Sequence, residues 1–139
     1  MYNKMTLEVT SLAENERFAR ATVGAFAGFV ATSIDVIADV KTIVSEAVTN
    51  SIVHGYLGDP EKTIRIDAVI DDDTLTVEIT DYGVGMEDVS KCMEDNYTTG
   101  SADERSGLGF TIIKALSETV DVSSQPGIGT IVKITKNLS

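Results

Sequence analysis

The chain has 139 residues, of which 22 are acidic and 11 are basic, so its formal net charge is -11. A chain of this length commonly forms one domain with a hydrophobic core, and we expect a single domain over residues 1–139. The negative charge would repel nucleic acid, so we expect no direct nucleic-acid contact.

The cysteine content and the hydropathy pattern bear on the cellular location. Cys92 is the only cysteine and cannot form an internal disulfide, which fits a reducing compartment. The start of the chain has no basic segment followed by an apolar one, and no run of about 18 apolar residues occurs. These features predict a cytoplasmic protein with no membrane segment.

The first segments predict a strand and an amphipathic helix. Residues 5–10 alternate apolar and polar side chains, as half-buried strands do. Ser11 and Glu14 have the spacing of a capping box, so we expect a helix to begin there and to continue through Val30. Its apolar stripe should face a sheet, whereas the small residues on its opposite face would admit a close neighbour.

A second helix follows, and the rest of the chain is organised around it. Thr32 and Ser33 can cap a helix over residues 35–54, and Gly55 is a natural stop for it. The loop over residues 56–62 then leads into strands.

This second helix carries Glu46, Asn50 and His54 at four-residue intervals. Residues four apart lie one above another on a helix, so the three side chains form a polar row along one flank. On a helical projection Glu46 points nearly opposite the apolar face, and Asn50 lies near the rim of that face. We interpret His54 as a helix-end residue that faces a site or caps carbonyl groups.

Alternating patterns in the second half of the chain predict four strands. Residues 64–70 and 75–79 alternate on either side of residues 71–73, which is typical of a hairpin. The acidic triplet at 71–73 lacks the other ligands of a calcium loop, so we interpret it as a solvated turn. Residues 119–123 and 130–135 predict two closing strands.

Residues 86–106 show little periodicity, and so long a connection in a compact domain is usually a lid or disordered. We interpret this segment as a lid. Thr98 and Thr99 supply hydroxyl groups in it, and Arg105 is its only arginine. A helix over residues 107–116 is expected to follow.

Two glycine-containing segments point to a ligand. Asp81, Gly83 and Gly85 end the predicted hairpin, where glycines permit a tight backbone course close to a ligand. Gly107 and Gly109 open the last helix, and free N–H groups at a helix start can hold phosphate. The chain has neither a Gly-Lys-Ser or Gly-Lys-Thr phosphate loop nor a G-x-G-x-x-G motif, so the two commonest nucleotide-binding folds are not indicated.

The polar groups suit the chemistry of a magnesium nucleotide. Asn50 can give a neutral oxygen to Mg²⁺, whose other ligands come mainly from phosphate and water. Asp81 can accept a hydrogen bond from the exocyclic amine of adenine. Glu46 can take a proton from an attacking hydroxyl or water, and Arg105 can offset charge at the terminal phosphate.

Four short motifs occur in a characteristic order: Glu46-x-x-x-Asn50, Asp81-x-Gly83-x-Gly85, Gly107-x-Gly109-Phe110 and Gly129-Thr130. They resemble the N, G1, G2 and G3 boxes of the GHKL ATP-binding superfamily, which includes gyrase, histidine kinases and MutL. More narrowly, residues 15–20, 44–50, 54–56 and 104–112 resemble the anti-sigma F family of sporulation serine kinases.

The resemblance implies a Bergerat fold, which is an α/β two-layer sandwich. Its sheet is mixed and mostly antiparallel, its helices lie on one face, and ATP binds between a helix and the lid. The resemblance also implies a homodimer that binds an RNA polymerase sigma factor in an ATP-dependent manner. Such a dimer phosphorylates a serine of an anti-anti-sigma factor, and ATP and ADP decide which partner is held.

By position, the resemblance makes Glu46 the general base, Asn50 the Mg²⁺ ligand and Asp81 the adenine partner. It makes Arg105 a contact to the γ-phosphate and Arg20 a contact to the protein partners. The other ATP-binding positions that it implies are Gly83, Gly85, Thr98, Thr99, Gly107, Gly109, Phe110 and Thr130.

Two alternatives stay open. One is another switch kinase of the same family, such as a stress-response anti-sigma factor, and the other is a non-catalytic ATP-dependent binding protein. A self-phosphorylating histidine kinase is not expected, because no helix with a phosphoacceptor histidine precedes the domain in this sequence.

Overall fold

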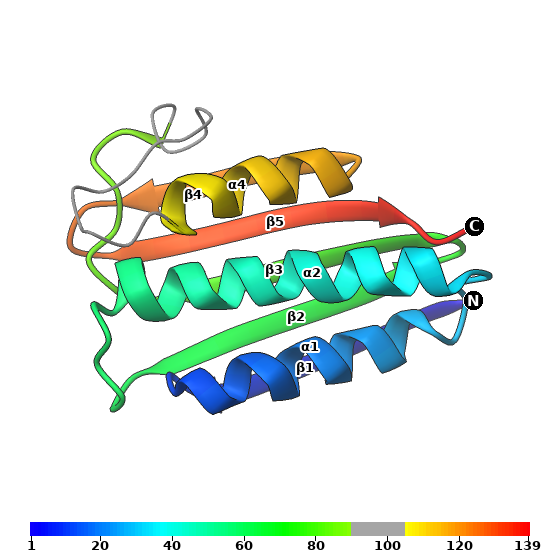
Figure 1. The fold of residues 1–139 in the computed structure, drawn as a ribbon, viewed down its shortest axis with the longest axis horizontal. Helices are drawn as coiled ribbons and strands as arrows, with labels where there is room; N and C mark the ends of the chain where they lie inside the picture. Colours follow the sequence, from blue (N-terminus) through cyan, green and yellow to red (C-terminus); the bar gives the residue numbers. More distant parts are fainter. Residues whose placement is uncertain (90–104) are drawn as a thin grey trace.

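The computed structural model describes residues 1–89 and 105–139, with only the backbone described for residues 105–108. In these ranges five strands form one sheet, and α1, α2 and α4 lie together on one face of it (Figure 1). The strands are β1 (Tyr2–Thr10), β2 (Thr63–Asp71), β3 (Thr74–Asp81), β4 (Thr119–Gln125) and β5 (Gly129–Asn137). The helices are α1 (Ala13–Ala27), α2 (Ile34–Asn50), its π-helical extension η1 (Ser51–Gly55) and α4 (Arg105–Leu116).

The sheet has the order β1-β2-β3-β5-β4, and all four strand pairings are antiparallel. The expected two-layer α/β arrangement with helices on one face is therefore confirmed. The parallel pairing that a mixed sheet would add does not occur among the described strands. Since β5 pairs with β3, the C-terminal hairpin lies next to the end of β3, where Asp81 is located.

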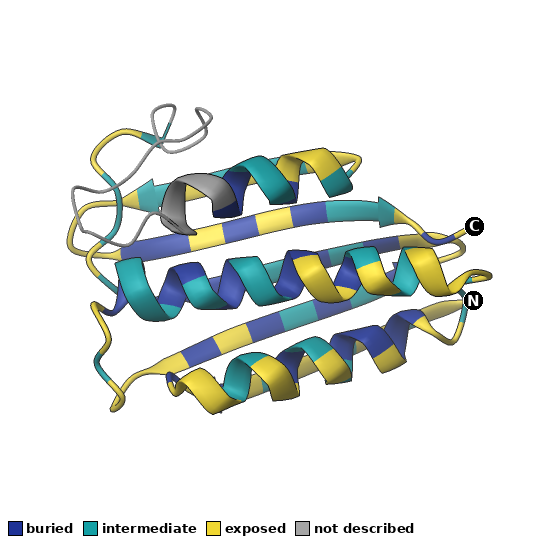
Figure 2. Ribbon diagram, viewed as in Figure 1, coloured by how far each residue is buried: buried dark blue, intermediate teal, exposed yellow. Residues whose placement is uncertain are grey.

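The β2–β3 hairpin follows the predicted alternation closely. Asp71 pairs with Thr74, so Asp72 and Asp73 form the turn, and the acidic residues 71–73 are exposed. Asp72 takes a φ of 54°, a left-handed conformation that Asp adopts more readily than most residues. The predicted solvated turn is confirmed. Figure 2 shows this alternation along β2 and β5, where buried residues alternate with more exposed ones over most of each strand.

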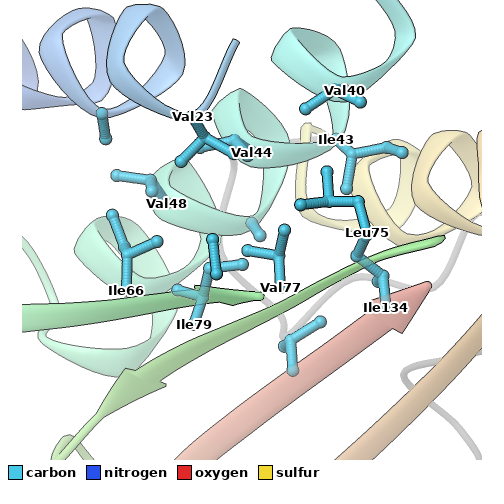
Figure 3. Packing of buried hydrophobic residues seen from close by; sticks show 14 of the residues in the cluster. Val23, Val40, Ile43, Val44, Val48, Ile66, Leu75, Val77, Ile79 and Ile134 are labelled. Atoms are coloured by element: carbon cyan, nitrogen blue, oxygen red, sulfur yellow. The ribbon is translucent and has the colours of Figure 1, made fainter. Parts of the chain in front are cut away.

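The core lies between the helices and the sheet. Side chains of α1 and α2 meet the helix-facing side chains of the strands, as the residues labelled in Figure 3 show. The central part of the apolar stripe expected on the second helix is buried: Val40, Val44, Ala47 and Val48 are at most 1% exposed. Burial of one such side chain contributes about 1.5–3 kcal/mol, so this stripe anchors α2 to the sheet.

The start and end of α1 differ from the predicted ones. The predicted capping box is wrong, because the helix begins at Ala13 and its N-cap residue, Leu12, makes no side-chain cap. Ser11 is instead drawn into the sheet layer, since its N–H donates to Lys62 O at 2.8 Å. The predicted extension through Val30 is also wrong, because α1 ends at Ala27 and the next residues form a turn.

The second helix begins as predicted but ends in a different geometry. The Ser33 hydroxyl accepts a hydrogen bond from Val36 N–H at 3.2 Å, which confirms the cap. After Asn50 the helix widens into the π-helical turn η1, which Tyr56 N–H closes by donating to Ser51 O at 2.8 Å. Single π turns of this kind are rare and frequently occur at functional sites.

Within the described ranges, none of the helices has both the length and the apolar character needed to cross a membrane.

Candidate functional site

Glu46 and Asn50 lie on the flank of α2 that faces α4. Asn50 is 9% exposed and Glu46 is half-buried, while Gly109 and Phe110 of α4 are buried. A Cβ atom added to Gly109 would lie 3.3 Å from Glu46 Oε2, so α4 passes directly beside this carboxylate. The structure therefore brings the predicted base together with the second glycine of the 107–109 motif.

Asp81 lies where β3 ends, beside the π-helical turn η1 that follows α2. It is 2% exposed, and a Cβ atom added to Gly55 would lie 2.8 Å from its carboxylate atoms. Gly83 N–H donates to Asp81 Oδ1 at 3.0 Å, and the polar groups of Ser51 and Thr130 also favour the charged form of the carboxylate. Gly55 is thus required by the close approach of Asp81.

Burial raises the pKa of Asp81 above its ordinary value, because it removes water from the charged form. The hydrogen bonds from Gly83, Ser51 and Thr130 act in the opposite direction, since they stabilise the carboxylate, but burial has the larger effect. A buried acid surrounded by donors is suited to binding a ligand rather than to forming an ordinary turn.

Gly83 and Gly85 lie against backbone of the protein itself. A Cβ atom on Gly83 would overlap the carbonyl group of Gly55, whose oxygen accepts a hydrogen bond from Val84 N–H at 2.9 Å. Gly85 has a φ of 72°, and a Cβ atom there would overlap the carbonyl group of Gln125. The two glycines hold the loop after β3 between η1 and the β4–β5 turn, and this packing accounts for the tight course that we predicted beside a ligand.

A cleft of about 510 Å³ opens beside Asp81, at the end of the sheet. Its lining comes from β3, from the start of the 86–106 segment and from the β4–β5 hairpin, and it includes Asp81, Val89, Val122, Ser124, Ile128 and Thr130. Binding sites for small molecules usually have volumes of about 300–1,000 Å³ and combine apolar walls with a few polar groups. The cleft beside Asp81 lies within this range of volumes, and its walls are mostly apolar.

Ser124 joins the walls of this cleft. Its hydroxyl accepts a hydrogen bond from Met86 N–H at 2.8 Å. It also lies 3.1 Å from Gly129 O and 2.7 Å from Thr130 Oγ1. The serine thereby connects the first residues of the predicted lid to the β4–β5 hairpin.

Arg20 lies away from the cleft, on α1. Its Nη1 atom is 3.5 Å from Glu16 Oε1, which also accepts a hydrogen bond from the Ser45 hydroxyl of α2. These residues border a groove of about 370 Å³ between α1 and α2. Since the Arg20 side chain is 38% exposed, its charge is accessible to another molecule.

Several predicted positions lie outside what the structure describes. Thr98, Thr99 and most of the predicted lid fall within residues 90–104. For Arg105 and Gly107 the backbone alone is described, and it shows that α4 begins at Arg105, two residues before the predicted start. The roles of these residues and of His54 stay predictions.

Three residues of the site were absent from the sequence prediction: Ser51, Gly55 as a neighbour of Asp81, and Ser124. Ser51 is the first residue of the π-helical turn and lies near Asp81, and no pattern in the sequence predicts that turn. The sequence pattern identifies Gly55, but as the stop of the second helix and not as a neighbour of Asp81. Ser124 lies opposite Thr130 because of the register of β4 and β5. That register can be stated only once the two strands are known to pair.

Comparison with known proteins assigns the chain to a family. Residues 9–136 match the family model of the histidine kinase-like ATPase domain. The anti-sigma F factor of Oceanobacillus iheyensis is 45% identical over 139 residues, which cover 100% of this chain and 95% of that protein. The anti-sigma F factor of Clostridium beijerinckii is 45% identical over 137 residues, which cover 99% of this chain and 96% of that protein. The chain belongs to the anti-sigma F factor family.

Solved structures share the fold of this anti-sigma F family member. The RsbU and RsbW domains of a Mycobacterium tuberculosis protein align with a TM-score of 0.70 and 20% identity, over 98% of this chain and 32% of that one. The blue-light activated histidine kinase of Erythrobacter litoralis aligns with a TM-score of 0.57 and 23% identity, over 87% of this chain and 42% of that one. The histidine kinase-like ATPase domain of the family implies nucleotide binding.

Proposed function

We propose that this anti-sigma F family member binds ATP along α2 and η1, with the adenine beside Asp81 and the phosphates beside Glu46, Asn50 and α4. The proposal rests on the placement of two polar sites along α2 and η1: Glu46 and Asn50 on α2, and Asp81 beside η1. From Glu46 to Asn50 the α-helix rises about 6 Å at 1.5 Å per residue, and η1 continues from there to Gly55, which lies against Asp81. The proposed phosphate site and the proposed base site therefore follow one another along α2 and η1.

The adenine end has the right polarity for an amino group. The ionised Asp81 carboxylate is a pure hydrogen-bond acceptor, and the exocyclic amine of adenine is a donor. Gly55 lets the carboxylate lie against the helix end, and Ser51 holds it there. The cleft beside it has mostly apolar walls against which a base can pack.

The phosphate end combines a helix start with an amide and a carboxylate. The N–H groups at the start of α4 are suited to phosphate oxygens, together with Gly107 and Gly109. Asn50 supplies a buried amide for Mg²⁺, which when bound neutralises charge on the phosphates. Within the described ranges no group of three or more His, Cys, Asp or Glu side chains could hold a metal ion, so this fit relies on ligands from the nucleotide.

The proposed reaction is phosphoryl transfer to a serine hydroxyl. Glu46 accepts the hydroxyl proton as the serine oxygen forms its bond to the γ-phosphorus. The bond from that phosphorus to the bridging oxygen breaks, and ADP leaves. Arg105 offsets the charge that develops on the phosphate oxygens, and Thr98 and Thr99 contribute hydroxyls from the lid over residues 86–106.

The proposed partners follow from the family. The anti-sigma F name of the relatives supports a sigma factor as the bound protein. We further propose that the phosphate acceptor is a serine of an anti-anti-sigma factor. We propose that a cytoplasmic homodimer carries out both tasks and that Arg20, whose charge is accessible beside the α1–α2 groove, contacts the partners.

The kinase proposal is tested with purified protein, Mg²⁺, labelled ATP and the candidate anti-anti-sigma factor. The wild type should transfer label to a serine, whereas Glu46→Gln should bind ATP but transfer no label above background. The exposed Glu61 provides the matched control, and Glu61→Gln should behave like the wild type. If Glu46→Gln retains full transfer, Glu46 is not the base, and if the wild type binds ATP without transfer, the chain is an ATP-dependent binding protein.

The partner proposal needs a separate measurement. The tagged chain is recovered from its native host with ATP and Mg²⁺ present, and bound proteins are identified by mass spectrometry. A sigma factor should be recovered with the wild type and depleted with Arg20→Glu. Absence of any sigma factor from the ATP-bound wild type would refute this part of the proposal.

A further inference from the structure

Ser124 and Thr130 are direct partners across the β4–β5 pairing, beside the cleft that contains Asp81. Three groups surround the Ser124 hydroxyl: Met86 N–H at 2.8 Å, Gly129 O at 3.1 Å and Thr130 Oγ1 at 2.7 Å. Thr130 is 4% exposed, so its hydroxyl has few partners other than Ser124 and a ligand in the cleft.

One arrangement of the hydroxyl protons satisfies all three contacts. Met86 N–H can only donate and Gly129 O can only accept, so Ser124 accepts from the first and donates to the second. The proton of Ser124 is then used, and its contact with Thr130 is a hydrogen bond only if Thr130 is the donor. The Thr130 hydroxyl can therefore act only as a hydrogen-bond acceptor toward a ligand in the cleft.

Asp81 adds a second group of the same polarity. Its carboxylate has about four acceptor positions, and Gly83 N–H donates to one of its oxygens, Oδ1, at 3.0 Å. Acceptor positions of this carboxylate therefore stay available to a ligand. This wall of the cleft therefore offers acceptors and no side-chain donor from either Asp81 or Thr130.

We propose that Ser124 is a positioning residue that fixes the Thr130 hydroxyl as an acceptor and so selects a 6-aminopurine over a 6-oxopurine. The inference rests on the proposed binding of a purine nucleotide in this cleft. The amino group at C6 of adenine offers two N–H donors to this wall. The keto oxygen at C6 of hypoxanthine would meet acceptor oxygens there, and unmatched polar groups on both sides lower affinity.

The test compares binding of ATP and ITP to the full chain by calorimetry with Mg²⁺ present. In Ser124→Ala the proton of Thr130 is released and can be donated to the keto oxygen, so the ATP-to-ITP affinity ratio should fall about tenfold, as expected for one hydrogen bond. Ser124→Thr retains a hydroxyl and should keep the wild-type ratio. Thr119→Ala is the matched control, because this exposed β4 residue also has a hydroxyl contact across the β4–β5 pairing, 2.7 Å to Thr135 Oγ1, but lies outside the lining of the cleft.

A double-mutant cycle separates this role from a structural one. In a Thr130→Val background no hydroxyl is left to orient, so adding Ser124→Ala should leave the ratio unchanged. If Ser124→Ala weakens ATP and ITP equally, or leaves the ratio at the wild-type value, the inference is overturned while ATP binding stands. If the wild type binds neither nucleotide, the proposed function itself is refuted and the inference with it.

Discussion

Gly55→Ala tests whether Asp81 is held in place by the end of the helix. The new methyl group would lie 2.8 Å from the carboxylate, whereas ordinary contact begins at 3.4 Å, so the carboxylate would have to move by about 0.6 Å. A movement of that size would stretch the 3.0 Å hydrogen bond from Gly83 N–H toward the limit of such bonds. Overpacking of this kind costs about 1–3 kcal/mol.

The loss should appear in ATP binding more than in folding. Alanine favours helical backbone over glycine by up to about 1 kcal/mol, which offsets part of the strain in the unliganded protein. Misplacement of the acceptor has no such offset, so ATP affinity should fall about tenfold to a hundredfold. Calorimetric titration with ATP gives the affinity, and thermal unfolding of the same sample gives the stability.

Gly24→Ala is the control, because the nearest atoms to its new methyl group belong to the flexible Lys41 side chain. This variant should bind ATP like the wild type and unfold at the same or a higher temperature. ATP affinity of Gly55→Ala within twofold of wild type, in a folded protein, would show that the carboxylate is free to move without consequence. The role assigned to Gly55 would then be refuted.

Two further predictions concern pH and the hydroxyl of Tyr56. Because the pKa of Asp81 is raised, the carboxylate protonates on acidification before an ordinary Asp does. Affinity for adenosine, which has no phosphate to titrate, should therefore begin to fall at a higher pH than the ordinary pKa of Asp predicts. The raised pKa of Asp81 contributes to the stability of the folded protein at low pH, and this contribution is lost as pH rises through the folded-state pKa. In urea unfolding, Asp81 should therefore cause no loss of stability on acidification. Tyr56→Phe removes a hydroxyl that donates to Thr63 O at 2.6 Å and accepts from Tyr82 N–H at 2.8 Å, and should lower the free energy of unfolding by about 1–3 kcal/mol. Tyr2→Phe, at a 65% exposed site, should change it by less than about 0.5 kcal/mol, and equal effects of the two variants in urea titrations would contradict the assignment.

The strands and the helix stripes were predictable because their signals are local. Alternation places Ile64 and Ile66 on one face whatever the rest of the chain does, and both are fully buried. The Ser33 cap depends only on the next three residues, and it was found. The end of α1 was misplaced because the apolar stripe continues past Ala27 into the turn, where Val30 still packs on the core.

The parts that escaped prediction depend on contacts between distant segments. Ser11 has the sequence spacing of a helix cap, but the hydrogen bond from its N–H to Lys62 O places it in the sheet layer. Ser124 belongs to the site because it contacts Thr130 across the hairpin and Met86 at the start of the predicted lid. Glu46 and Asn50 were found because they recur at four-residue spacing along one flank of the second helix, and Asp81 because it precedes two glycines in a tight turn. The roles assigned to the three residues stay proposals.

The glycines around Asp81 explain how a buried acid can be tolerated there. Gly55 and Gly83 remove the side chains that would otherwise fill the space between η1 and the loop after β3, and Gly129 allows β5 to approach the Asp81 backbone. The close approach lets Gly83 N–H donate to the carboxylate at 3.0 Å, while polar groups of Ser51 and Thr130 also favour its charged form. Burying an unpaired carboxylate would cost several kcal/mol, so these polar groups make an acceptor at the end of β3 compatible with folding. In the function we propose, the motif glycines act on the nucleotide through Asp81, by fixing where its carboxylate is presented.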